Sequence, residues 1–156
     1  MSASAVKDID RGWARIRREL RQLDGAYTKV GLQTGAEHAD PQSGDLSDLV
    51  MIGAVHEFGT RRIPQRSWLR TAFDSNRTAI QGMKTTLFGK VLENRMSPLQ
   101  AFQLLGEFFQ AKVRANIVKI KSPANAPSTI ARKGSTNPLI DTSQMLQSVR
   151  HVEVGV

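Results

Sequence analysis

The three histidines of this chain are the residues whose type suits acid–base or metal chemistry. His56 stands directly before Glu57, as in the H-E-x-x-H motif of zinc proteases, but Thr60 occupies the position of the second histidine. His38 and His151 have no cysteine partner, because the chain contains no cysteine. We therefore predict that the chain is not an enzyme and holds no metal or cofactor. His56 is expected to be partly buried and to donate one hydrogen bond.

Two further segments have the composition of ligand-binding sites. The segment 131–136, ARKGST, resembles the end of a phosphate-binding loop, but it lacks the upstream glycine and a following long helix. The segment 34–47 holds a histidine and several carboxylates, which are metal-ligand types. Its glycine, serine and proline residues predict a mobile, solvated loop, and such a loop lacks the supporting contacts that orient metal ligands.

Basic residues are in excess. The chain has 22 Lys and Arg against 14 Asp and Glu, which gives a formal net charge of +8. Such an excess favours contact with phosphates or with acidic protein surfaces. One group of arginines lies close together within the segment 61–70, and its members are candidates to face DNA or an acidic partner: Arg61, Arg62, Arg66 and Arg70.

The segment 50–74 must position this group of arginines. It begins with an apolar run at 50–55 that is too short to distinguish a helix from a strand. Gly59 releases the backbone to positive φ and predicts a sharp turn. Pro64 predicts a new helix that begins within 64–67, because proline is tolerated in the first turn of a helix. The first buried face of that helix is expected to hold Trp68, Leu69, Ala72 and Phe73.

Hydrophobic periodicity predicts three longer helices. A basic first helix spans 4–23, and a second continues from the turn to about residue 93. Gly82 and Gly89 interrupt this second helix and indicate a kink or a close helix crossing. The third helix begins after Ser97, which combines a capping side chain with a following proline.

Alternating apolar and polar residues predict two strands, at 27–33 and 150–156, that pair into a small sheet. The segment 122–137 is rich in proline and small polar residues, so we expect an extended arm that reaches a neighbouring subunit. A brief helix at 143–148, capped by the residues before it, follows the arm. The predicted fold is α+β, a small antiparallel sheet packed against several long helices, in a single domain of residues 1–156.

The composition also bears on the location of the protein. The first residues carry charges where a signal peptide needs an apolar core. Apolar runs in the chain are shorter than a membrane span. We therefore expect a soluble protein without membrane contact.

Two motifs carry a family resemblance. The segment 54–74 contains HEFGT, then basic residues, then IPQRSWLRTAFD. It resembles a pattern found in neck and tail-completion proteins of tailed bacteriophages, related to the lambda-type minor tail protein Z group. The segment 133–149, with KGS, PLIDT, ML and SV, is similar to a second motif of that family. Ser143 stands where the family usually has glycine, and Trp68 where phenylalanine is commoner.

The resemblance implies a structural virion protein that joins the tail to the head-connector region by association. It implies a closed ring, most often of six subunits, with tail terminator, tail tube or head-connector proteins as partners and genomic DNA in the lumen. The expected location is the virion, after assembly in the host cytoplasm. Each subunit of a ring needs two different complementary surfaces. The interface candidates are Phe58, Gly59, Arg61, Arg62, Ile63, Pro64 and Trp68 on one surface, and Arg132 and Lys133 of the arm on the other.

Two alternatives stay open at the level of sequence. Phe58 and Trp68 are also the residue types of an ordinary core. The chain as a whole suits a basic DNA-binding module that uses the arginine face of the first helix. A stable ring-sized mass without DNA favours the first function, whereas a monomer that shifts only with duplex DNA favours the second.

Overall fold

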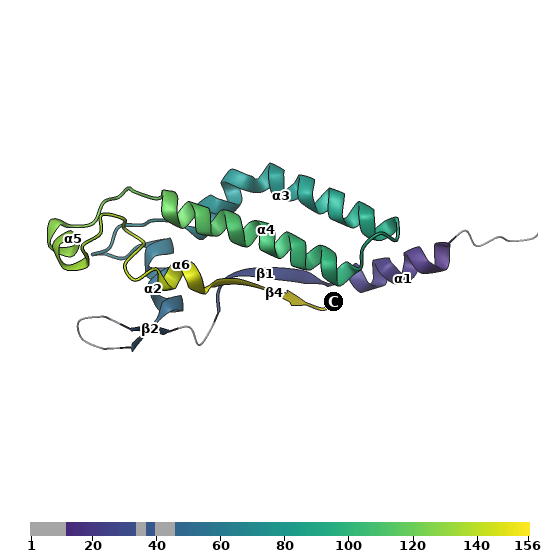
Figure 1. Ribbon diagram of the computed structural model, residues 1–156, viewed down its shortest axis with the longest axis horizontal. Helices are drawn as coiled ribbons and strands as arrows, with labels where there is room; N and C mark the ends of the chain where they lie inside the picture. The colour runs from purple at the N-terminus through teal and green to yellow at the C-terminus, as the bar shows by residue number, and fades with distance from the viewer. Residues whose placement is uncertain (1–11, 34–36, 40–45) are drawn as a thin grey trace, which may run out of the picture.

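Two long helices run along the elongated molecule (Figure 1). They are α3 (Leu69–Leu92) and α4 (Pro98–Lys119), which lie side by side and antiparallel. The start of α4 is as expected, because Ser97 and Gln100 form a complete capping box ahead of its first turn. This computed structural model describes residues 12–33, 37–39 and 46–156.

A two-stranded antiparallel sheet packs on α4, so that α4 lies between the sheet and α3 (Figure 1). β1 (Tyr27–Leu32) pairs along its whole length with β4 (Val149–Val154). Gly106 of α4 permits the close approach of β4, since a Cβ atom there would lie 2.8 Å from Cδ2 of His151. The predicted α+β fold and the predicted pairing of these two strands are confirmed.

Buried side chains form two clusters along α4, and the expected apolar stripe of this helix contributes to both. The smaller cluster joins α3 to the first turns of α4 through Leu87, Val91 and Ala101. The larger cluster lies nearer the C-terminal end of α4 and contains Leu49, Trp68, Ala72, Val113, Ile117, Leu139, Met145 and Val149. Each buried large aliphatic side chain contributes about 1.5 to 3 kcal/mol. The larger cluster therefore fixes the start of α3 and the C-terminal segment against α4.

Shorter elements surround these layers. In chain order they are α1 (Trp13–Leu23), β2 (Glu37–Ala39), β3 (Leu46–Asp48), α2 (Leu49–Phe58), α5 (Pro127–Lys133) and α6 (Gln144–Ser148). In Figure 1, α1 lies at one end of the molecule and α5 at the other. None of the helices that the structure describes combines the length and the apolar character needed to cross a membrane.

The segment 34–47, expected to be a mobile loop, contains part of a hairpin. β2 pairs antiparallel with β3, which supplies hydrogen-bond partners for both backbone segments. Residues 34–36 and 40–45 lie outside the described residues. The apolar run at 50–55 is helical, and Asp48 caps it by accepting a hydrogen bond from the amide of Val50 at 2.8 Å.

The arm expected at 122–137 is wrong in its middle, which forms α5. Pro127 occupies the first turn of this helix, and Gly134 ends it with φ 67° in the left-handed region. Both are ordinary helix signals. The segment was nevertheless expected to be extended, because it has few apolar residues. Likewise, Ser143 adopts φ 63° ahead of α6 without a capping hydrogen bond, although the residues before 143–148 were expected to cap that helix.

Three expectations on the long helices are also corrected. The helix expected to begin within 64–67 begins at Leu69. Gly82 and Gly89 mark no close helix crossing, because a Cβ atom at either would meet nothing within 4 Å. Phe73, expected in the core, is 42% exposed and packs edge-on against Phe109, with ring centroids 5.8 Å apart. Of the first helix, expected at 4–23, residues 4–11 lie outside the described residues.

Candidate functional site

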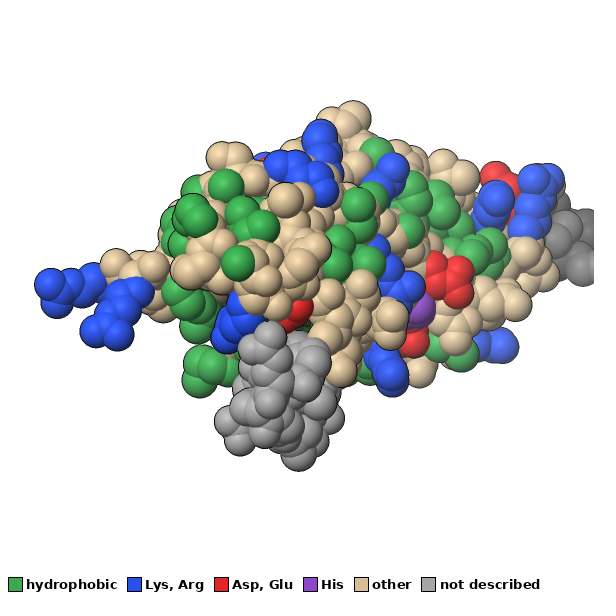
Figure 2. Space-filling model, turned by 60° about the vertical axis from the view of Figure 1, so that its left-hand side comes forward, with side chains coloured by type: hydrophobic (Ala, Val, Ile, Leu, Met, Phe, Trp, Pro, Cys, Tyr) green, Lys and Arg blue, Asp and Glu red, His purple; other side chains and the backbone are tan. Residues whose placement is uncertain are grey.

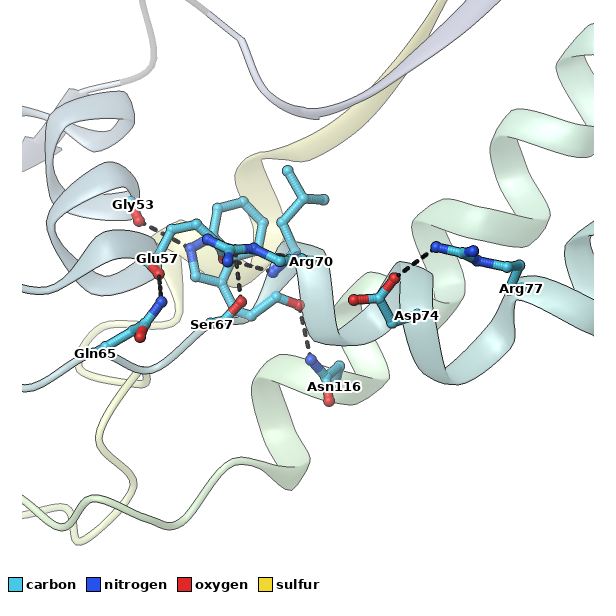
Figure 3. A network of polar contacts seen from close by, with 10 residues as sticks. Gly53, Glu57, Gln65, Ser67, Arg70, Asp74, Arg77 and Asn116 are labelled. Atoms are coloured by element: carbon cyan, nitrogen blue, oxygen red, sulfur yellow. Dashed lines mark hydrogen bonds and ion pairs between the residues drawn. The ribbon is translucent and has the colours of Figure 1, made fainter.

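Glu57, at the end of α2, is buried and organises the central turn, which we define as residues 59–68. Its carboxylate accepts hydrogen bonds from the hydroxyl of Ser67 at 2.6 Å and from the amides of Leu69 at 2.8 Å and Arg70 at 3.2 Å (Figure 3). These amides open α3, where backbone N–H groups have no partner within the helix. A side chain of α2 therefore caps α3, and this contact sets the start of that helix.

The central turn is closed by its own backbone and by Thr60. Gly59 has φ 74°, and a Cβ atom there would lie 2.9 Å from the amide nitrogen of Gln65. The amide of Thr60 donates to the carbonyl of Ile63 at 2.8 Å, and the Thr60 hydroxyl accepts from the Ile63 amide at 3.0 Å. The side chain of Gln65 donates to the carbonyl of Glu57 at 3.0 Å (Figure 3). The sharp turn predicted at Gly59 is confirmed.

Trp68 lies in the core, where it is 4% exposed. Its indole Nε1 donates to the carbonyl of Gly53 in α2 at 2.9 Å, and its own carbonyl accepts from the side chain of Asn116 in α4 at 2.7 Å. Of the two alternatives for this residue, core packing therefore describes it. Trp68 holds the central turn against two helices and presents no surface to a partner.

Arg66 is also buried, at 5% exposure, so its expected role in facing DNA is wrong. Its guanidinium donates to the carbonyls of Pro123 at 2.7 Å and Ala124 at 3.0 Å. A third contact, at 3.5 Å, reaches Nδ1 of His56, which must accept because an arginine only donates. Nδ1 of His56 thus accepts a hydrogen bond, and the expected donation by His56 stays a prediction. Arg66 ties the segment after α4 to the central turn.

A cleft of about 600 Å³ opens between α2 and the central turn on one side and the segment 124–145 on the other. We call it the basic cleft. Six of the interface and DNA-facing candidates line it, namely Arg62, Ile63, Pro64, Arg66, Arg132 and Lys133. The central turn and the arm were expected on two separate surfaces. The structure places them around one hollow.

Positive charge dominates the basic cleft. Arg62, Arg66, Arg132 and Lys133 line it, and Asp141 is the one carboxylate among the described residues of its lining. Burial lowers the pKa of Lys133, and repulsion from Arg66 and Arg132 adds to this, while Asp141 raises it. The pKa of His56 falls to about 4, mainly through burial and further through Arg66 and Lys133. His56 is therefore neutral at pH 7, and four cations face one anion among the lining residues that the structure describes.

Two buried polar atoms in the lining residues of the basic cleft have no hydrogen-bond partner. They are Nδ2 of Asn125 and Oγ1 of Thr142. A buried donor without a partner costs about 1 to 3 kcal/mol. Thr142 belongs to the PLIDT motif, whereas no sequence pattern pointed to Asn125 or to Glu57 as a cap. The reason is that the hydrogen-bond partners of these residues, or the absence of partners, depend on segments that come together only in the folded chain.

The outer face of α2 is apolar and exposed. Met51 is 65% exposed and Phe58 is 69% exposed, and two turns of helix separate them on the same side. The guanidinium of Arg70 lies 5.8 Å from the centroid of the Phe58 ring. Arg61 is exposed on the adjoining central turn. Phe58, Arg61 and Arg70 are therefore on the surface, as an interface requires.

Across the described residues, histidines and carboxylates form no group of three or more that could hold a metal ion. Asp40 and Asp45, which suggested such a group in the sequence, lie outside that part of the chain. No family model, curated protein or solved structure matches the chain. The resemblance to phage tail-completion proteins therefore stays a prediction.

Proposed function

We propose that this chain is a structural virion subunit of a tailed phage, a neck or tail-completion protein that forms a closed ring and joins the tail to the head-connector region. The sequence resemblance supplies the class of protein and the expected sixfold ring. The observation that supports it best is the exposed apolar face of α2, formed by Met51 and Phe58, beside the hydrogen-bonded central turn. Exposed apolar patches of this kind mark surfaces that associate with another protein.

A ring also requires a second surface that differs from the first, because its contacts are head-to-tail. The outer side of α4 offers one. Leu104 is 38% exposed and Val118 is 45% exposed, and about four helical turns place them on the same side. Phe108 lies between them, with the Lys112 ammonium 5.1 Å from its ring centroid. Each subunit would then place the face of α2 against the α4 face of its neighbour.

Light scattering coupled to size exclusion tests ring formation. The intact chain is expected to elute at a ring-sized mass without DNA, and the double variant Met51→Ser/Phe58→Ser as a monomer. Leu92→Ser is the control, since Leu92 is 38% exposed at the end of α3, away from both faces. A monomeric intact chain at all concentrations, or a ring unaffected by the α2 variant, would count against the proposal.

The phage that encodes the chain provides the test of its place in the virion. Replacing Arg61 and Arg62 together by glutamate reverses the charge of an exposed part of the central turn without removing a core contact. We expect this variant to fold and to leave tails unjoined to heads, with a large loss of titre. Unchanged titre, or absence of the chain from purified particles, contradicts the proposed function.

A second candidate function is a basic DNA-binding module. The observation that favours it is a small hollow on α1 lined by Ala14, Arg17, Arg18 and Arg21. Such a group of arginines suits phosphate contacts. A monomer whose mass rises only when duplex DNA is added would favour this function over the ring.

A further inference from the structure

The basic cleft has a mixed lining. Besides its cations, it is lined by Ile52 of α2, by Ile63 and Pro64 of the central turn, and by Leu139 and Met145, which belong to the larger core cluster. A purely electrostatic site for a small anion needs no such apolar wall. A cleft of this composition suits a ligand that is partly apolar and partly anionic.

The size and lining of the basic cleft favour a peptide over nucleic acid. About 600 Å³ holds a few residues of an extended chain but not a DNA duplex. Phe, Tyr and Trp are missing from the described residues that line it, although single-stranded nucleic acid is usually held by stacking of bases on such rings. Among the described lining residues, cations exceed anions by three, and this excess selects carboxylates on the peptide.

The unpaired atoms of Asn125 and Thr142 indicate that the ligand should also offer hydrogen-bond acceptors. Both are shielded from water, so neither recovers its lost hydrogen bond from solvent. A peptide offers carbonyl and carboxylate oxygens, which accept from an amide N–H or a hydroxyl. A small side-chain rotation on binding would let these two residues donate to it.

We infer that the basic cleft binds a short extended segment of a partner protein, in which an apolar side chain lies between carboxylate residues. The apolar side chain contacts Ile52, Ile63 and Leu139, and the carboxylates lie against Arg62, Arg132 and Lys133. The partner is a different protein, because the exposed apolar faces assigned to contacts between copies lie on α2 and α4. The inference rests on the proposed function, since a joining subunit must capture a protein outside its own ring.

Fluorescence anisotropy with labelled pentapeptides tests this inference on the intact chain. The probe is Glu-Asp-Leu-Glu-Asp, and the two matched peptides are Gln-Asn-Leu-Gln-Asn and Glu-Asp-Ser-Glu-Asp. We expect the probe to bind at least about tenfold more tightly than either. Equal binding of the serine peptide shows attraction by charge alone, and lack of binding by the probe excludes the site; both overturn the inference.

Charge-reversal variants test whether the probe peptide binds in the basic cleft. Arg62→Glu/Arg132→Glu is expected to weaken probe binding by about tenfold or more, whereas Lys84→Glu/Lys90→Glu, the same charge change at exposed positions of α3, leaves it within about twofold. Equal loss in both variants, or competition by duplex DNA for the cleft, overturns the inference. The mass of the Arg62→Glu/Arg132→Glu variant should stay that of the ring; a fall to monomer shows that a second copy occupies the cleft.

Thr142→Val is a second test variant, chosen because it is expected to fold. Valine has the shape of threonine and removes the unpaired hydroxyl, so stability should be unchanged or higher. Probe binding should nevertheless weaken by about threefold or more. Unchanged binding contradicts the inference. If the intact chain is a monomer and still binds the probe, the proposed ring has failed while the proposed peptide site in the basic cleft has not.

Discussion

Glu57 is the residue on which the polar contacts of the central turn converge. Its buried carboxylate receives two backbone amides at the start of α3 and the hydroxyl of Ser67. Negative charge is favourable at this end of a helix, because the aligned peptide dipoles leave it partly positive. The charge also attracts Arg70, whose Nε lies 3.7 Å from the carboxylate. A buried acid is thus supported by several donors at once.

Replacing Glu57 by glutamine is expected to lower the free energy of unfolding by about 2 to 3 kcal/mol. The change removes the charge and turns an N–H₂ group toward amides that can only donate. Urea denaturation at pH 7 measures the loss. Asp74→Asn is the control, because it removes an exposed ion pair with Arg77 that contributes about 0.5 kcal/mol or less (Figure 3). Equal stability of the two variants would refute the capping role.

His56 should make stability depend on pH. Its pKa is about 4 in the folded chain and 6.5 in a free histidine, lowered by burial and by Arg66 and Lys133. Between these pH values the unfolded chain binds a proton that the folded chain does not, so the free energy of unfolding decreases as pH falls from about 6.5 to 4. Above about pH 6.5 the full contribution of His56 to stability is present. We expect a loss of about 2 to 3 kcal/mol. His56→Gln should flatten this part of the urea-midpoint profile; an unchanged profile contradicts the assignment.

At the scale of elements, the central turn depends on one glycine. Gly59→Ala places a side chain at positive φ and within 2.9 Å of the backbone of Gln65, so we expect a loss of about 2 to 4 kcal/mol. Gly82→Ala is the matched control in the middle of α3, where the new methyl group meets nothing, and it should stabilise by about 0.5 to 1 kcal/mol. Thermal unfolding measures both. A mild effect of Gly59→Ala would show that the turn tolerates rearrangement.

The elements that the sequence predicted correctly have a clear apolar pattern or a strong cap, and the alternating strands β1 and β4 are among them. α4 has both, with its apolar stripe and the Ser97 capping box. The start of α3 was misplaced because Pro64 looked like a helix start, whereas the carboxylate of Glu57 captures amides farther along the chain. α5 and the β2–β3 hairpin were missed because neither has an apolar face long enough to give a period.

The candidate site was partly predictable for a similar reason. The motif residues around Gly59 and the pair Arg132–Lys133 were found from local chemistry, and both reach the basic cleft or its surroundings. Their meeting was not predictable, because Arg66 contacts Pro123 and Ala124, which lie far away in the chain. The same holds for the burial of Trp68, which depends on Gly53 and Asn116.

At the scale of the whole molecule, where the full chain has a net charge of +8, the Lys and Arg side chains of the described residues lie on several surfaces. Figure 2 shows Lys and Arg side chains at separate places on one face, with apolar side chains between them. The helix α1, which carries Arg17, Arg18 and Arg21, lies at one end of the molecule, and α5, which carries Arg132 of the basic cleft, lies at the other (Figure 1). A distribution of this kind suits several protein contacts better than one continuous track for a DNA duplex.

This distribution predicts how the chain behaves toward free DNA. Because its cations do not follow one duplex, we expect a Kd for short duplex DNA no tighter than about 1 μM at physiological salt, as for non-specific binding. The slope of the affinity against salt concentration, on logarithmic scales, should correspond to the release of fewer than about four counterions. The triple variant Arg17→Glu/Arg18→Glu/Arg21→Glu should change it little more than Lys84→Glu/Lys90→Glu does. Tighter binding with a salt slope of six or more, abolished by the α1 variant alone, would instead establish α1 as a DNA-binding surface.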